Sequence, residues 1–140
     1  MAVVSDEVKR FFEEFERLNS GAEIDAAGMA KLYSDTFMAA DPNGAHAVPK
    51  APFLAMLPKR KEMFASAGYS SSTLVDIEER QLDETYTLVD TKWTMKPIDP
   101  SHKQNLGLSS SFILRRTNGS FEIVFYLNHQ DIASKLKSME

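Results

Sequence analysis

Residues 106–129 read Leu-Gly-Leu-Ser-Ser-Ser-Phe-Ile-Leu-Arg-Arg-Thr-Asn-Gly-Ser-Phe-Glu-Ile-Val-Phe-Tyr-Leu-Asn-His. Two segments of β-prone residues flank Asn118-Gly119, a dipeptide typical of tight β-hairpin turns, so the stretch predicts a hairpin. Apolar residues recur at every second position and predict one buried face, made of Phe112, Leu114, Phe121, Ile123, Phe125 and Leu127. This assignment of faces holds only where no β-bulge interrupts the strands. The buried face must pack against another element, which the apolar helices upstream can supply.

Composition narrows the class of protein. The 140 residues suffice for one sizeable core, so we expect residues 1–140 to form a single domain. A net charge of -4 without a basic cluster disfavours binding to nucleic acid. The absence of cysteine excludes disulfides and thiolate metal sites. No apolar stretch approaches the length of a membrane span, so we expect a cytoplasmic protein without a membrane partner.

Helices precede the long strands. Apolar residues at helical spacing predict an amphipathic helix from Ser5 to Leu18 that is capped by Ser5. The other elements expected upstream and downstream of the hairpin are a short helix after Asp25 that includes Tyr33, a hairpin over residues 36–48, a helix over 51–67 that is kinked or split at Pro58, a strand pair over 72–81 and 85–95, and a terminal helix over 131–139. This order predicts an α+β domain in which a curved antiparallel sheet wraps around the N-terminal helices.

The same order resembles the nuclear transport factor 2-like superfamily, a cone-shaped, cystatin-like α+β fold that includes ketosteroid isomerase and SnoaL-type cyclases. The similarity is carried by Leu18-Asn19-Ser20-Gly21, by Leu32-Tyr33-Ser34-Asp35, by Asp41-Pro42-Asn43-Gly44 and by residues 111–124. The resemblance implies a cavity between the helices and the concave face of the sheet. It does not fix an activity, because this fold hosts enzymes, binding modules and association domains.

Asp41 is the candidate catalytic base. The resemblance places it where ketosteroid isomerase has its general base, and such a base needs a carboxylate that faces an apolar cavity. An aspartate before Pro-Asn-Gly also commonly bonds its own turn, so a purely structural role is the alternative. The isomerase's two oxyanion donors correspond to Glu14 and Ser110, neither of which matches, and steroid isomerisation is therefore disfavoured.

The histidines offer few further possibilities. His46 would lie across the turn from Asp41 and could complete an Asp-His pair. His129 ends the last strand and could bind a ligand at the cavity rim or cap the strand, whereas His102 falls in a polar loop. No histidine pair has the spacing of a metal site, so we expect no metal and no cofactor.

Aromatic and sulfur-containing side chains are the candidates for the cavity wall. Trp93 and Tyr126 are the best candidates to orient a ligand, because each combines an apolar ring with a polar group. The full set of candidate ligand-binding residues is Tyr33, Phe37, Phe53, Met56, Trp93, Met95, Ser110, Phe112, Tyr126 and His129, most of which could equally be ordinary core.

Three functions remain open at this point. The first is a small-molecule-binding cone whose ligand is apolar or contains a carbonyl group, and which forms a homodimer through its sheet. The second is an acid/base enzyme, an isomerase, cyclase or dehydratase, that uses Asp41 on a hydrophobic carbonyl compound. The third is a non-catalytic association module with a filled cone.

Overall fold

A computed structural model describes residues 4–20, 25–101 and 103–138. In chain order its elements are α1 (Asp6–Ser20), α2 (Ala26–Ala30), β1 (Tyr33–Asp41), β2 (Gly44–Pro49), α3 (Lys50–Ser66), β3 (Tyr69–Gln81), β4 (Tyr86–Pro97), β5 (Leu106–Thr117), β6 (Ser120–Asn128) and α4 (Ile132–Ser138). The predicted order of helices and strands is confirmed.

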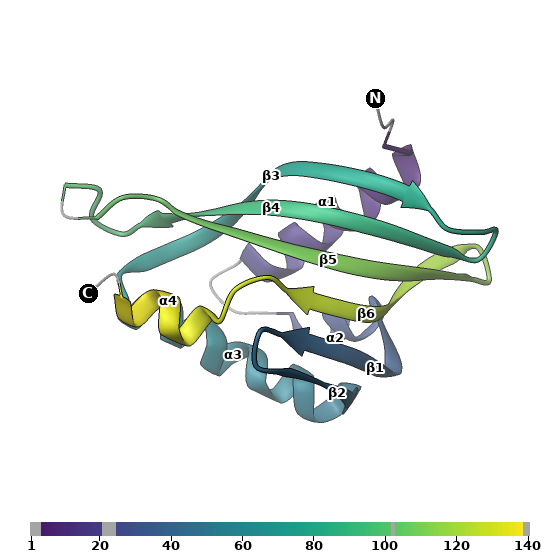
Figure 1. The fold of residues 1–140 in the computed structure, drawn as a ribbon, viewed down its shortest axis with the longest axis horizontal. Helices are drawn as coiled ribbons and strands as arrows, with labels where there is room; N and C mark the ends of the chain where they lie inside the picture. Colours follow the sequence, from purple (N-terminus) through teal and green to yellow (C-terminus); the bar gives the residue numbers. More distant parts are fainter. Residues whose placement is uncertain (1–3, 21–24, 102, 139–140) are drawn as a thin grey trace.

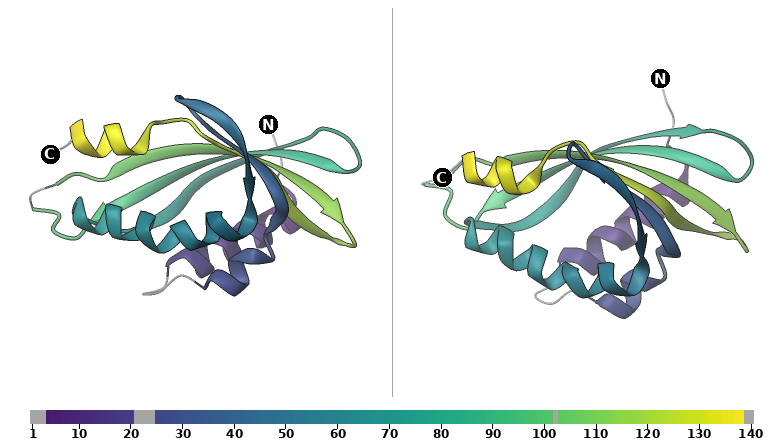
Figure 2. Two further views of the ribbon diagram at one scale, coloured as in Figure 1. Left: turned by 90° about the horizontal axis from the view of Figure 1, so that it is seen from below. Right: turned by 60° about the horizontal axis from the view of Figure 1, so that its bottom comes forward.

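The strands form a six-stranded sheet in the order β2-β1-β6-β5-β4-β3 (Figure 1). Strand β1 runs parallel to β6, and the other neighbouring pairs are antiparallel. Helices α1, α2 and α3 lie under one face of the curved sheet, and α4 lies beside one end of it (Figure 2). The predicted α+β architecture, a curved open sheet around N-terminal helices, is therefore confirmed.

Helix α1 packs on the middle of the sheet through its apolar face. The Ser5 side chain accepts a hydrogen bond from the Val8 amide at 3.3 Å, which confirms the predicted cap. The ring of Phe12 is fully buried and lies 5.1 Å from that of Phe112 on β5. Helix and hairpin thus cover each other, as the alternation in residues 106–129 requires.

The second helix is shorter than expected, and the third is one continuous helix, one of the two alternatives left open. The second helix ends at Ala30, and Tyr33 already belongs to β1, although Asp25 caps this helix as predicted. Helix α3 continues through Pro58 and is not split into two helices. Packing of α3 against the core stabilises the helix enough to tolerate the loss of the internal hydrogen bond that a proline removes.

The β5–β6 hairpin forms as predicted, but its faces are not those that simple alternation gives. Asn118 and Gly119 both have positive φ, 51° and 79°, as a tight two-residue hairpin turn requires. The register then shifts, because Leu114 pairs with Ile123 whereas Ile113 pairs with Phe125. Val124 is left without a partner in this ladder, and the bulge reverses the alternation beyond it.

The bulge corrects one prediction. Tyr126, which pairs with Phe112, faces the helices in place of Phe125 and Leu127. Phe125 and Leu127 turn to the outer face, where both are half-buried.

Among the described residues, no helix combines the length and the apolar character needed to cross a membrane.

The hairpin turn provides a first prediction. Gly119→Ala should lower the free energy of unfolding by about 1–2 kcal/mol, since an L side chain is disfavoured at positive φ. A Cβ atom at Gly119 would meet no other atom within 4 Å, so conformation alone is tested. Urea unfolding measures the loss. Gly107→Ala is the matched control, because that site is equally open and lacks a positive φ, and it should cost nothing. Equal losses in both variants would contradict this account of the turn.

Candidate functional site

A cavity of about 120 Å³ lies between the inner face of the sheet and the helices. It occurs where two clusters of buried side chains meet, one built around α1 and the other around the start of β5, with Leu108 packed against both. The residues that line it are Phe15, Asn19, Met29, Tyr33, Phe53, Leu57, Arg60, Lys61, Phe64, Ser70, Ser72, Trp93, Met95, Leu108, Ser109, Ser110, Phe112, Tyr126, Asn128, Gln130 and Ile132.

Stacked aromatic rings form the sheet side of the cavity. The rings of Phe112 and Tyr126, on neighbouring strands, stack with centroids 5.1 Å apart and planes inclined by 15°. Phe15 of α1 contacts both Phe112 and Trp93, with centroid distances of 5.7 and 5.8 Å. These contacts fix the wall, because large planar side chains packed on several sides have few alternative rotamers.

Tyr33, from strand β1 of the same sheet, also lines the cavity. Its ring packs against Phe37 and Phe53 at 4.9 and 5.0 Å, and only 3% of the residue is exposed. Burial raises the pKa of the Tyr33 hydroxyl far above its ordinary value, with a smaller contribution from Tyr126. The hydroxyl therefore stays protonated at neutral pH and can donate a hydrogen bond into the cavity.

Arg60 brings a positive charge to the cavity wall. Phe53, Leu57, Arg60 and Phe64 are spaced by four, three and four residues, so α3 presents all four on one face. The Nη2 atom of Arg60 donates to the Tyr126 hydroxyl at 3.1 Å. Tyr126 raises the pKa of the Arg60 guanidinium, which outweighs the opposite effect of burial. Arg60 is therefore a cation at neutral pH.

A buried hydrogen-bond network holds Trp93 in place. The indole Nε1 atom donates to Thr91 Oγ1 at 2.7 Å, and the Thr91 and Ser110 hydroxyl oxygens lie 2.9 Å apart. Thr91 Oγ1 also donates to the Ser110 carbonyl oxygen at 3.0 Å. The indole ring consequently has one defined orientation at the cavity surface.

Amide side chains complete the wall near the end of β6. Gln130 binds the Ser109 backbone twice, as its Oε1 accepts from the Ser109 amide at 3.0 Å and its Nε2 donates to the Ser109 carbonyl at 2.8 Å. Asn128 Oδ1 accepts from the Gln130 backbone amide at 3.3 Å. Gln130 thus extends the pairing of β5 past the end of β6.

Comparison with known proteins identifies the family. Residues 3–131 match the family described as "NTF2-like protein (DUF6841)", which is most of the chain. The chain belongs to this NTF2-like family. No curated protein matches the sequence.

Solved structures share the NTF2-like fold at low sequence identity. An NTF-2 like protein of unknown function from Shewanella oneidensis MR-1 has a TM-score of 0.70 at 14% identity, over 89% of this chain and 98% of that one. A protein of unknown function with a cystatin-like fold from Nostoc punctiforme has a TM-score of 0.70 at 11% identity, over 94% and 96% of the two chains. Aln2 from a Streptomyces species has a TM-score of 0.72 at 13% identity, over 95% and 97%. At these identities the likeness concerns the fold alone.

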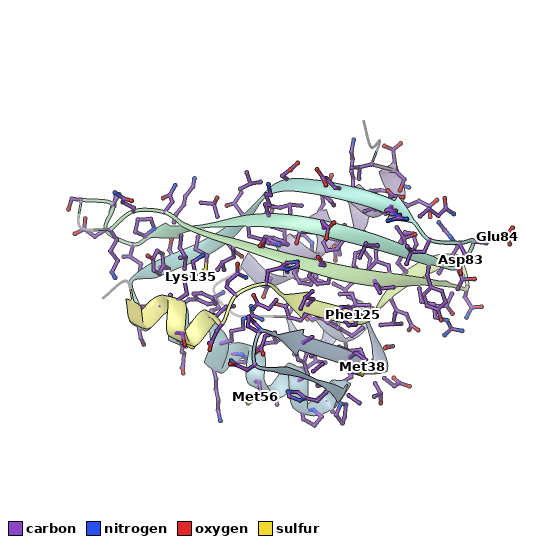
Figure 3. The ribbon with its side chains drawn as sticks, in the orientation of Figure 1. Met38, Met56, Asp83, Glu84, Phe125 and Lys135 are labelled. Atoms are coloured by element: carbon purple, nitrogen blue, oxygen red, sulfur yellow. The ribbon has the colours of Figure 1, made fainter. Side chains whose placement is uncertain are left out.

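Most of the predicted ligand-binding residues lie at the NTF2-like cavity. Tyr33, Phe53, Trp93, Met95, Ser110, Phe112 and Tyr126 line it. Phe37 is buried behind Tyr33 and Phe53 and does not line it. Met56 is 56% exposed and points away from the helix face that meets the sheet (Figure 3), so its placement at the cavity was wrong.

The expected catalytic pair lies elsewhere. Asp41 is exposed at the β1–β2 turn, and its Oδ1 accepts from the Asn43 amide at 2.8 Å. His46 is exposed on β2, the edge strand of the sheet. Neither residue lines the cavity. Asn43 of the same turn instead donates to Asp131 Oδ2 at 2.8 Å, next to α4. The geometry of Asp41 is that of a turn-forming aspartate, and the predicted carboxylate facing an apolar cavity is not found there.

His129, expected either to bind a ligand at the cavity rim or to cap the strand, does not line the cavity and lies on the outer face of the sheet. Its Nε2 atom is 2.7 Å from Ser111 Oγ, which also donates to Asp90. Among the described residues, no three His, Cys, Asp or Glu side chains are grouped so that they could hold a metal ion.

Arg60 is the main residue that sequence reasoning missed. Its spacing from Phe53, Leu57 and Phe64 was the available signal, but Arg60 lies between Lys59 and Lys61 in the sequence and the three read as one basic run. A charged residue at an apolar helix position is a candidate for a buried functional group.

The Trp93 network provides a second prediction. Thr91→Val should lower the free energy of unfolding by about 1–3 kcal/mol, since the isosteric change leaves the indole N–H without an acceptor. Urea unfolding followed by circular dichroism measures it. Thr94→Val, on the outer face of the same strand, is the control and should change stability by less than about 0.5 kcal/mol. An unaffected Thr91→Val protein would show that the network contributes no stability.

Proposed function

We propose that this protein binds a small ligand with an apolar body inside its cone. The observation that carries the proposal is the cavity of about 120 Å³. Its wall is mostly aromatic and also includes the polar groups of Arg60, Tyr33 and Tyr126. Convergent polar groups in an apolar cavity are the usual composition of a small-molecule site. A cone that served only for association would gain stability from filling this space, since empty volume is destabilising.

Binding is favoured over acid/base catalysis by the chemistry of the cavity wall. None of the lining residues in the described part of the chain is Asp, Glu or His. Tyr33 is a poor general acid, because burial raises its pKa far from neutrality. The alternative in which Asp41 is the base loses its support, since that carboxylate bonds its own turn.

Blocking the cavity tests the proposal. Ser72, from β3, lines the cavity, and Ser72→Phe should place a ring inside it. Trp93 is the only tryptophan of the chain and lines the same cavity, so its fluorescence reports occupancy. Titration with 3-phenylpropanol and 3-phenylpropanoate should quench or shift this emission in the natural protein. Ser72→Phe should weaken binding at least about tenfold, or about 1.4 kcal/mol.

Thr73→Phe is the matched control. Thr73 is the next residue of β3 and is exposed on the other face, so this protein should bind like the natural one. Binding by Ser72→Phe with unchanged affinity would locate the ligand outside the cone. No binding of either probe to the natural protein would contradict the proposed function.

We also propose that the outer face of the sheet pairs with a second copy of the chain. Met38 of β1 is 39% exposed there and pairs with Phe125 of β6, and the two lie beside each other in Figure 3. Half-buried Leu127 and Ile113 extend this apolar surface. An apolar sheet face of this kind is a typical protein contact surface.

A charge on this surface should dissociate the dimer. Sedimentation equilibrium should give nearly twice 15.7 kDa for the natural protein and about 15.7 kDa for Phe125→Glu. Leu82→Glu, at an exposed apolar residue in the β3–β4 loop, is the control and should leave the dimer intact. A natural protein that sediments as a monomer would overturn this proposal.

A further inference from the structure

We infer that Arg60 makes the cone selective for ligands that carry an anionic oxygen group, of the monocarboxylate class, on an apolar body. This inference rests on the proposed binding function of the same cavity. It is carried by the charges of the cavity wall and by the surroundings of the Arg60 guanidinium.

The lining residues that the structure describes include basic side chains and no acidic one. The basic residues are Arg60 and Lys61. The other polar lining groups are neutral hydroxyls and amides, such as Ser110 and Asn128. A ligand with a negative charge would therefore enter a field that favours it.

Arg60 has a neutral partner and unused donors. Its one hydrogen bond to another described side chain uses Nη2 and ends on the Tyr126 hydroxyl. No ion pair joins Arg60 to an acidic residue in the described ranges. A guanidinium has five N–H donors in a planar fork that matches a carboxylate, so most of this capacity remains for a ligand.

The position of Arg60 is fixed before any ligand enters. The guanidinium carbon lies 5.9 Å from the centre of the Tyr126 ring, which also stacks on the ring of Phe112. Leu57 and Phe64, one turn away on either side of Arg60, are buried. Because helix α3 and strand β6 hold the side chain from two directions, little conformational entropy is lost when it binds a carboxylate.

The energetics favour an anion over a neutral ligand. Arg60 is half-buried, and a cation partly removed from water costs free energy unless a partner of opposite charge replaces the lost hydration. An anionic ligand supplies that partner. Tyr33, which contributes to the raised pKa of Arg60, adds a neutral hydrogen-bond donor at the same end of the cavity. The apolar body then lies against Phe15 and Trp93, which line the cavity from α1 and β4.

Three probes with one apolar body separate the charge from the shape of the ligand. Calorimetry with the full chain compares 3-phenylpropanoate, the neutral 3-phenylpropanamide and the cationic 3-phenylpropylamine. The carboxylate should bind at least about tenfold more tightly than the amide, and the amine most weakly, since a charge-assisted hydrogen bond contributes about 1.5–3 kcal/mol. Arg60→Gln should remove the preference for the carboxylate and change amide binding less than about threefold.

Lys59→Gln is the matched control. It removes one positive charge from the adjacent, exposed position of the same helix, so the preference should remain. Arg60→Lys keeps the charge and loses the fork, and it should give an intermediate preference. Thermal unfolding of each variant verifies that it is folded, and amide binding verifies that its cavity is intact.

Two results would overturn the inference and leave the binding function standing. One is equal affinity of the natural protein for the carboxylate and the amide, and the other is an unchanged preference in folded Arg60→Gln. Failure of all three probes to bind would overturn the binding function and this inference together.

Discussion

The bulge at Val124 is the constraint on which the cavity depends. Side chains on a strand alternate between its faces, so one unpaired residue reverses every face assignment beyond it. Phe121 and Ile123 face the helices before the bulge, and Tyr126 does so after it. With unbroken alternation, Phe125 would occupy the cavity wall and the Tyr126 hydroxyl would point away from α3. The bulge thus gives the inner face its polar group and the outer face its apolar surface.

Tyr126 in turn links the sheet to helix α3. Its ring stacks on Phe112, and its hydroxyl accepts from Arg60, so one side chain connects β5, β6 and α3. This contact retains a charged side chain at a helix position that otherwise belongs to the apolar face. A lone guanidinium at such a position would be costly, and a hydroxyl offsets only part of that cost. The arrangement stabilises the fold less than an apolar side chain would, which is typical of binding sites.

The aromatic residues of α1 belong to one of two clusters of buried side chains, and the cavity lies where the two clusters meet. Phe11, Phe12 and Phe15 contact Phe121, Phe112 and Trp93, whereas Phe64 and Ile132 belong to a second cluster around the start of β5. Where the two clusters meet, neither supplies enough side-chain volume to fill the cone. The cavity is therefore a consequence of how the core is divided, and its walls are as rigid as the clusters that form them.

Features that follow from neighbouring residues could be predicted from the sequence. The Asn118-Gly119 turn, the Ser5 and Asp25 caps, the amphipathic α1 and the order of the elements depend on local conformational preference and on short-range periodicity. Seven cavity-lining residues were also among the candidates, because aromatic, sulfur-containing and small polar side chains were selected for their chemistry. The features that could not be predicted depend on contacts between segments that are distant in the sequence. The bulge depends on the register of β5 against β6, and the position of Arg60 depends on a hydrogen bond to a tyrosine 66 residues away. The exposure of Asp41 depends on where the β1–β2 hairpin lies in the folded sheet. Periodicity within one segment carries no information about these contacts, because they are made between elements that meet only in the folded protein.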